Sequence, residues 1–458
     1  YYYCHNRHRS LDAMKKKDKM KRLGVLLLVI TAITVIITFV IVMNLSDSAE
    51  QTGQKQEHFD DSYSGWIRNV YIMSNKENEI IILYDHTNYI AKGTAQSDYT
   101  GVADIELSNG KITHILAKSD GIEGVLDCYS EKEVQIKDYE ALSYEGTLPV
   151  YVVSDSLLVR QPVRQIAMSD LVIGNSKVKL IVADKKACAI VQYSKDIANN
   201  IRVLLKNGNN ITYSDLYIKS NKAYTVNEKK VTAKKLTAAS SYLKGKKNGE
   251  EICISPTTGK LFVCNSRGKK IAEGYEGNFI IRKEADGYIL INELPVEDYV
   301  RYVLPSEMPL GFSYEALKAQ AVCARTFAYG QMHNQAYAQY GANLDDTTAY
   351  QVYHATTTYD VTDQAVLDTS GMVLTYDDAL TDCYYYSTSP GYSETLEVWN
   401  ADSPGYLKGE NHTQAKTKDL SNKQAFHKFI NKQVKSYDSD SPYYRWTATI
   451  SNKMGMDS

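Results

Sequence analysis

The sequence lacks the patterns that mark several well-known chemistries. Its seven cysteines include no Cys-x-x-Cys pair and no cysteine–histidine spacing typical of a zinc site. No Gly-x-Ser-x-Gly segment is present, so the nucleophile elbow of an α/β-hydrolase is not expected. The histidines His333, His354 and His412 are scattered along the chain, which favours structural roles over metal binding.

A strong excess of basic charge is also missing. The 52 Lys and Arg residues are opposed by 54 Asp and Glu residues, so the chain has no footprint of nucleic-acid binding. Residues 1–22 are the exception, with eight basic and two acidic residues and a net charge of +6. Residues 44–458 carry 44 basic and 52 acidic residues, a net charge of −8.

An apolar run without any charged residue follows the basic segment, at residues 23–43. A helix of this length spans a hydrocarbon core of about 30 Å. A buried core helix is the alternative, but the basic flank favours a membrane span with its N-terminal side in the cytoplasm. We therefore predict a cytoplasmic tail (1–22), one transmembrane helix (23–43) and an extracytoplasmic remainder. Because the first residue is Tyr1 and not Met, we interpret this end as that of a fragment.

The remaining sequence predicts two globular regions after a polar linker at residues 44–63. Short alternating runs over residues 64–200 predict a β-rich accessory region. Within it, Asn109-Gly110 between two such runs is typical of a hairpin with a type I′ turn. The 37 tyrosines suit half-buried strands as well as carbohydrate-facing surfaces, and the strand interpretation is favoured.

Residues 201–458 predict a mixed domain, so the fold class expected for the whole chain is α+β. Strands are expected at 177–183, 201–206, 252–254, 261–264, 279–283 and 288–291. A helix is expected from Tyr314 to Gly330 with Ser313 as its N-cap. Its positions Leu317, Ala321, Ala324 and Ala328 form a narrow apolar stripe. A second helix is expected at 362–370, followed by a strand–turn–strand around 376–378.

The cysteines of this domain leave their pairing open. Cys253 and Cys264 flank a turn at 256–259 between apolar runs, which would allow a disulfide across a hairpin. Nothing in the spacing requires that bond.

Glu307 is the carboxylate that most merits attention, because Pro305 and Pro309 restrict the backbone on both sides of it. A carboxylate on a rigid turn can be aimed as a general acid. A solvated residue before a helix is the plainer interpretation. Lys318 and Arg325, seven residues apart on the expected helix, would bind an anion or form a solvated face.

The segments LPVEDYVRYVLPSEMP (294–309) and EALKAQAVCARTFAY (315–329) resemble the stage II sporulation protein D and amidase-enhancer family of bacterial cell-wall proteins. Three later segments fit in order: DDTTAYQVY, YYYSTSPGYSETLEVW and PYYRW. The resemblance covers roughly residues 201–446 and is densest over 294–399.

This resemblance implies a peptidoglycan lytic transglycosylase, which cleaves the bond between N-acetylmuramic acid and N-acetylglucosamine and leaves a 1,6-anhydro end. It implies that Glu307 is the catalytic acid and base. It also implies a substrate-binding role for Lys318, Arg325, Gln351, Tyr353, Ser387, Thr388 and Ser389. One carboxylate suffices because the sugar's own 6-hydroxyl attacks, whereas ordinary glycosidases need two.

Departures from the family pattern shape three further expectations. The loop before Gln351 has Asp345, Asp346 and Tyr350 where some relatives carry zinc-binding Cys and His, so we expect no metal and no cofactor. The chain ends before the family's usual glycine-rich segment, which indicates a truncated C-terminus. The accessory region lies outside the resemblance and would serve as a spacer or a binding module.

Two other functions remain as alternatives. The first is a non-catalytic, wall-binding activator of an N-acetylmuramoyl-L-alanine amidase. The second is a scaffold whose working part is the accessory region. The resemblance implies glycan strands, an amidase and membrane proteins of the forespore-engulfment machinery as partners.

Overall fold

The computed structural model describes residues 57–76, 79–93, 99–153, 163–193, 199–353, 357–399, 402–414, 419–432 and 434–447. The chain divides into two compact units, the first formed by residues up to Ser119 with 161–165, the second by 120–160 and the residues from Ile166 onward. The β-rich residues predicted as one accessory region therefore fall into both units.

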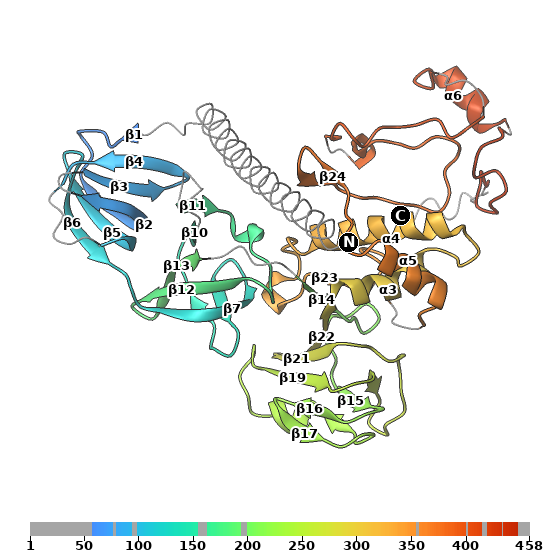
Figure 1. Cartoon of the computed structure of the whole chain (residues 1–458), viewed down its shortest axis with the longest axis horizontal. Helices are drawn as coiled ribbons and strands as arrows, with labels where there is room; N and C mark the ends of the chain where they lie inside the picture. The colour runs from blue at the N-terminus through green and yellow to red at the C-terminus, as the bar shows by residue number, and fades with distance from the viewer. Residues whose placement is uncertain are drawn as a thin grey trace, which may run out of the picture. The chain divides into compact units, whose positions relative to one another are not determined.

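The first unit is a single sheet with the strand order β1-β4-β3-β2-β5-β6 (Figure 1). Its strands are β1 (Glu57–His58), β2 (Gly65–Lys76), β3 (Glu79–Tyr84), β4 (Thr87–Ala91), β5 (Gly101–Ser108) and β6 (Lys111–Ala117). The predicted hairpin joins β5 to β6, and Asn109 and Gly110 have φ angles of 53° and 70°, as a type I′ turn requires. Strand β1 lies within the segment predicted as a linker.

The second unit begins with another sheet, in which the strand order runs β10-β13-β12-β7-β8-β9. The strands are β7 (Gly121–Tyr129), β8 (Glu133–Ile136), β9 (Leu142–Ser143), β10 (Val150–Val153), β12 (Lys177–Ala183) and β13 (Lys186–Gln192). Strand β11 (Val163–Ile166) crosses the boundary between the units, because residues 161–165 are assigned to the first unit and Ile166 to the second. Leu126, Leu180 and Ile190 form part of the buried core of this sheet.

The sheet that carries the candidate site has the order β17-β16-β19-β21-β22-β14-β23. Its strands are β14 (Asn200–Leu204), β16 (Tyr224–Val226), β17 (Lys229–Val231), β19 (Glu251–Pro256), β21 (Asn278–Glu284), β22 (Gly287–Pro295) and β23 (Leu344–Asp345). A small second sheet contains β15 (Tyr217–Ser220), β18 (Thr237–Ala238) and β20 (Leu261–Cys264), and a short helix, α2 (Ser240–Leu243), follows β18. Cys253 and Cys264 thus lie in different sheets, and both are free thiols.

Three helices pack together beside this sheet (Figure 1). They are α3 (Val296–Glu307), α4 (Tyr314–Gln331) and α5 (Asp360–Asp368), and a short hairpin, β24 (Thr375–Tyr376) and β25 (Ala379–Leu380), follows them. The Ser313 side chain accepts a hydrogen bond from the Ala316 N–H, so the predicted N-cap is confirmed. The predicted small-residue stripe of α4 is also confirmed, because all four of its side chains are fully buried. Short helices and a last helix, α6 (Lys423–Ile430), complete the elements.

The predicted α+β class is corrected, because the structure is mostly β, with 38% strand and 17% helix. The excess of strand arises because the residues before 290 form successive strands, whereas the longer helices, α3 and α4, come after them and have 12 and 18 residues.

The prediction of a single-pass membrane protein is contradicted as well. No helix in the described part of the chain is long and apolar enough to cross a membrane. The residues on which that prediction depended, 1–22 and 23–43, lie outside the described residues.

Candidate functional site

Glu307 is the last residue of α3, which follows directly from strand β22. Val300, Val303 and Leu304 are buried and anchor the helix in the core that it shares with the sheet. The sequence suggested a turn between two prolines, but α3 continues through Pro305 to Glu307 before the backbone becomes extended. The rigid helix end therefore fixes the position of the half-buried Glu307 side chain.

The Glu307 carboxylate is held by a backbone donor from a distant segment. Its Oε1 accepts a hydrogen bond of 2.7 Å from the N–H of Val352, 45 positions later in the sequence. Val352 lies between Gln351 and Tyr353, so the predicted motif Gln-Val-Tyr does contact the predicted acid. Among the described residues, Oε2 has no hydrogen-bond partner, which leaves this oxygen for chemistry.

Gln351 joins three parts of the domain beside that contact. It is fully buried; its Oε1 accepts from the Tyr299 hydroxyl at 3.1 Å, and its Nε2 donates to the Ala324 carbonyl at 3.3 Å and to the Tyr385 hydroxyl at 3.1 Å. Helix α3, helix α4 and the segment after β25 therefore meet at one amide. This geometry favours a positioning role for Gln351.

Two tyrosine hydroxyls near Glu307 stay protonated at neutral pH. Burial raises the pKa of Tyr299 well above its usual value, and Coulombic interactions with the Tyr385 hydroxyl and with Glu307 raise it further. Burial also raises the pKa of Tyr385, against the hydrogen bond from Gln351, and Glu307 adds to the increase. Both side chains are therefore neutral, and their hydroxyls can donate hydrogen bonds.

Tyr353 belongs to the aromatic core. It is fully buried, its hydroxyl donates to Asn292 Oδ1 at 2.7 Å, and its ring lies 5.0 Å from that of Tyr299 and 6.0 Å from that of Tyr275 between centroids. These contacts hold the Gln-Val-Tyr segment against the sheet and so present the Val352 N–H to Glu307.

Lys318 and Arg325 have different environments although they share a helix. Lys318 is partly exposed, and its Nζ lies 3.1 Å from Glu315 Oε2. Arg325 is fully buried; its Nε and Nη2 each lie 2.8 Å from the Glu297 carboxylate, and its other donors reach backbone carbonyls, including that of Met372. Glu297 and Glu307 are ten residues apart on α3, so the carboxylate that Arg325 binds lies roughly 15 Å from Glu307 along the helix axis.

The hydroxyl-rich turn contacts the C-terminal segment. Ser387 is exposed, the Thr388 hydroxyl hydrogen-bonds to Ser441 at 2.9 Å, and the Ser389 hydroxyl donates to Asp438. None of the hydrogen bonds found between described residues joins these three side chains to Glu307. The structure thus places Gln351 and Tyr353 beside the Val352 donor of Glu307, whereas the side chains of Thr388 and Ser389 bond to the C-terminal segment.

Sequence reasoning missed Tyr299, Tyr385 and the Val352 N–H. The run of three tyrosines at 384–386 gave no means of choosing the central one, and a backbone donor has no residue-type signal at all. Within the described ranges, no group of three or more His, Cys, Asp or Glu side chains could hold a metal ion. The expected absence of a metal stays a prediction.

Comparison with known proteins supplies the class to which this site belongs. Residues 284–376, which include β22, α3, α4 and α5, match the family model described as stage II sporulation protein. This span contains Glu307, its Val352 donor and the buried Gln351. The matched region is therefore a domain of the kind found in stage II sporulation proteins.

The relatives extend this result. Stage II sporulation protein D of Bacillus subtilis is 38% identical over 133 residues, which are 26% of this chain and 38% of that protein. The amidase enhancer of the same organism is 40% identical over 113 residues, 24% of this chain and 15% of that protein. The chain thus matches well under half the length of either relative. Residues 284–376 thus carry a domain of the stage II sporulation protein family, and the similarity to stage II sporulation protein D and to the amidase enhancer agrees with the resemblance found in the sequence.

Proposed function

We propose that the chain is a peptidoglycan lytic transglycosylase in which Glu307 is the single catalytic acid and base. The observation that carries the proposal is the Glu307 carboxylate, fixed at a helix end with one oxygen bonded to the Val352 N–H and the other available. The similarity of residues 284–376 to stage II sporulation proteins supports a substrate in the cell wall, and glycan strands are the substrate that this chemistry requires.

In the proposed reaction, protonated Glu307 donates its proton to the glycosidic oxygen while the bond from that oxygen to C1 of N-acetylmuramic acid breaks. The resulting carboxylate then takes the proton of the 6-hydroxyl of the same sugar, whose oxygen forms the new bond to C1. No water is consumed, and Glu307 ends in its starting state. Attack within one molecule also removes the entropic cost of positioning a second reactant.

A second carboxylate is not needed at the site, and the nearby Asp345 is poorly suited to that task. Asp345 is buried; its Oδ1 accepts from Thr347, and its Oδ2 accepts from the Tyr337 hydroxyl at 2.8 Å. Glu307 is therefore the better candidate for direct contact with a sugar.

The other predicted residues divide into two groups in this proposal. Lys318 and Ser387, which are at least partly exposed, remain proposed sugar contacts, and so does Thr388. The buried Arg325, Gln351, Tyr353 and Ser389 would act by holding the surrounding segments in place.

The test compares the full chain with its Glu307→Gln variant on purified glycan strands, with and without stem peptides. Mass spectrometry would measure 1,6-anhydro-muramyl products. We expect such products from the parent chain and at least about a 100-fold loss in the variant, because a general acid contributes about that factor or more. Glu228→Gln is the matched control, since Glu228 is exposed in the turn between β16 and β17.

The amidase-enhancer relative supports a second candidate, a non-catalytic activator of a cell-wall amidase. If a folded parent chain releases no anhydro product from either substrate, the transglycosylase proposal fails. Addition of a purified N-acetylmuramoyl-L-alanine amidase then tests the activator. An increase in stem-peptide release that survives Glu307→Gln would establish it.

A further inference from the structure

Two cysteines that are distant in sequence lie in contact inside the second unit. Cys323 is on α4, and Cys383 follows the β24–β25 hairpin, 60 positions later. Their thiols share a side-chain hydrogen bond. Cys323 is partly exposed, whereas Cys383 is buried.

The backbone segments around the two thiols are held together by other bonds. The Gln351 amide links the carbonyl of Ala324, next to Cys323, to the hydroxyl of Tyr385, two residues after Cys383. The closeness of the sulfur atoms is thus a property of the fold around them and not of the thiols alone.

The other described cysteines do not share this arrangement. The thiol of Cys128 contacts the Gln135 side chain, that of Cys253 contacts Ser255, and those of Cys188 and Cys264 donate to backbone carbonyls. In the part of the chain that the structure describes, the thiol–thiol hydrogen bond is therefore specific to Cys323 and Cys383.

The two thiols also differ in reactivity. The hydrogen bond from Cys383 lowers the pKa of Cys323 to about 7, although burial acts in the opposite direction. The hydrogen bond to Cys323 raises the pKa of Cys383, and burial raises it further. At neutral pH a large fraction of the partly exposed Cys323 is thus thiolate, with a buried thiol beside it, as in pairs that react with disulfides.

We propose that Cys323 and Cys383 are a redox-modified pair, which a disulfide oxidant converts to a disulfide that fastens the Cys383–Tyr385 segment to α4. The Cys323 thiolate attacks the oxidant's disulfide, forms a mixed disulfide and releases one thiolate. Cys383 then loses its proton to that thiolate and attacks the Cys323 sulfur; the Cys323–Cys383 bond forms and the second half of the oxidant leaves as a thiolate. The pair loses two electrons, and the oxidant is reduced to two thiols.

The bond would act on the segment that carries Tyr385. Without the disulfide, a hydrogen bond holds Tyr385 against Gln351 beside the Glu307 site; with it, a covalent link holds the same segment. Closing a loop of this length stabilises a fold, and we expect the midpoint of thermal unfolding to rise by roughly 5–15 °C. Any effect on glycan cleavage rests on the proposed function, but formation of the bond does not.

The test treats the folded full chain with glutathione disulfide at neutral pH, blocks free thiols by alkylation and maps the peptides by mass spectrometry. We expect a Cys323–Cys383 linked peptide that disappears after reduction. The proposal is overturned if both cysteines are recovered alkylated, if Cys323 keeps only glutathione, or if either cysteine is linked to another one.

Variants test the order of attack. Cys383→Ser should trap glutathione on Cys323, whereas Cys323→Ala should leave the buried Cys383 unmodified. Cys253→Ala is the matched control and should retain the linked peptide. If Cys253→Ala abolishes the link, or if Cys383→Ser leaves Cys323 free, the assigned pair is wrong. Because the readout is a mass, the result is independent of whether the chain cleaves glycan.

Discussion

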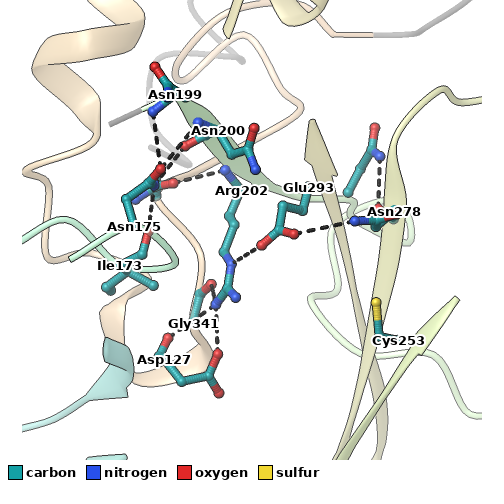
Figure 2. A network of polar contacts seen from close by, with 12 residues as sticks. Asp127, Ile173, Asn175, Asn199, Asn200, Arg202, Cys253, Asn278, Glu293 and Gly341 are labelled. Atoms are coloured by element: carbon teal, nitrogen blue, oxygen red, sulfur yellow. Dashed lines mark hydrogen bonds and ion pairs between the residues drawn. The ribbon is translucent and has the colours of Figure 1, made fainter. Parts of the chain in front are cut away.

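Replacement of Arg202 by methionine would remove the centre of a buried charge network (Figure 2). Arg202 lies on β14 and is 1% exposed. Its Nε is 2.8 Å from Glu293 Oε2 on β22, and its Nη1 is 2.8 Å from Asp127 Oδ1 on β7. Its Nη1 also donates to the Gly341 carbonyl at 3.3 Å. One guanidinium thus joins three chain segments of the second unit.

The expected cost follows from the burial of the partners. The Asp127 and Glu293 side chains are 1% and 10% exposed, so neither regains full hydration when Arg202 is lost. Breaking one buried ion pair by removing a partner costs about 3–5 kcal/mol. We therefore expect Arg202→Met to lower the free energy of unfolding of the second unit by at least about 3 kcal/mol. The stability of Arg202→Lys should lie between those of the parent chain and Arg202→Met, because one ammonium cannot bind both carboxylates as the guanidinium does.

The loss of unfolding free energy caused by Arg202→Met should also depend on pH. Burial, and then the charge of Asp127, raise the pKa of Glu251 to about 7, while Arg202 and Arg282 act in the opposite direction. Because this pKa is above the value of 4.5 for an exposed glutamate, the folded state binds the proton more tightly, and the contribution of Glu251 to stability falls as pH rises from 4.5 to 7. Loss of Arg202 raises the pKa further, so the deficit should be larger at pH 7.5 than at pH 5.

Urea denaturation followed by tryptophan fluorescence and circular dichroism at both pH values would measure this effect. Arg267→Met, at an exposed position between β20 and β21, is the control and should change stability by less than about 0.5 kcal/mol. A loss below about 1 kcal/mol for Arg202→Met, or a deficit equal at both pH values, would refute the reasoning from buried charge.

Two further substitutions test neighbouring features. Gly174→Ala should lower the free energy of unfolding by about 1–3 kcal/mol more than Gly208→Ala in the same denaturation assay. Both glycines have a positive φ, but a Cβ at Gly174 would lie 2.5 Å from Arg202 Nε, whereas a Cβ at Gly208 would meet no atom within 4 Å. Arg325→Met should cost about 2–4 kcal/mol, since it leaves the carbonyls of Val366 and Met372 without their buried donor and breaks the ion pair with Glu297. Lys318→Met should cost less than about 1 kcal/mol, because its ion pair with Glu315 is exposed. Equal unfolding midpoints within either pair would contradict the assignments.

The elements predicted well from sequence are those whose cause is local. Ser313 supplies an N-cap and the next eighteen residues form α4, since capping and helical spacing act within a few positions. The Asn109-Gly110 turn was predictable because its positive φ angles suit these residue types. The strand at 177–183 has the predicted bounds.

The parts that were not predictable depend on contacts between distant segments. Nothing local shows that Arg325 faces Glu297 and not solvent, so its spacing from Lys318 suggested a shared face that burial does not support. The contact between Cys323 and Cys383 joins positions far apart, whereas local spacing could only allow, without requiring, a bond between Cys253 and Cys264. The donor to Glu307 is a backbone N–H, which any residue type could provide.

The Arg202 network also determines how a role for the accessory region should be tested. Deletion of residues 64–200 would remove Asp127 together with most of the first unit, and Arg202 would lose a buried partner. A loss of wall binding in that variant would then report damage to the sheet that leads into α3 and not the absence of a scaffold. Deletion of residues 64–119 leaves Asp127 in place and removes strands of the first unit. Wall binding that survives this shorter deletion would exclude the first unit as the working part.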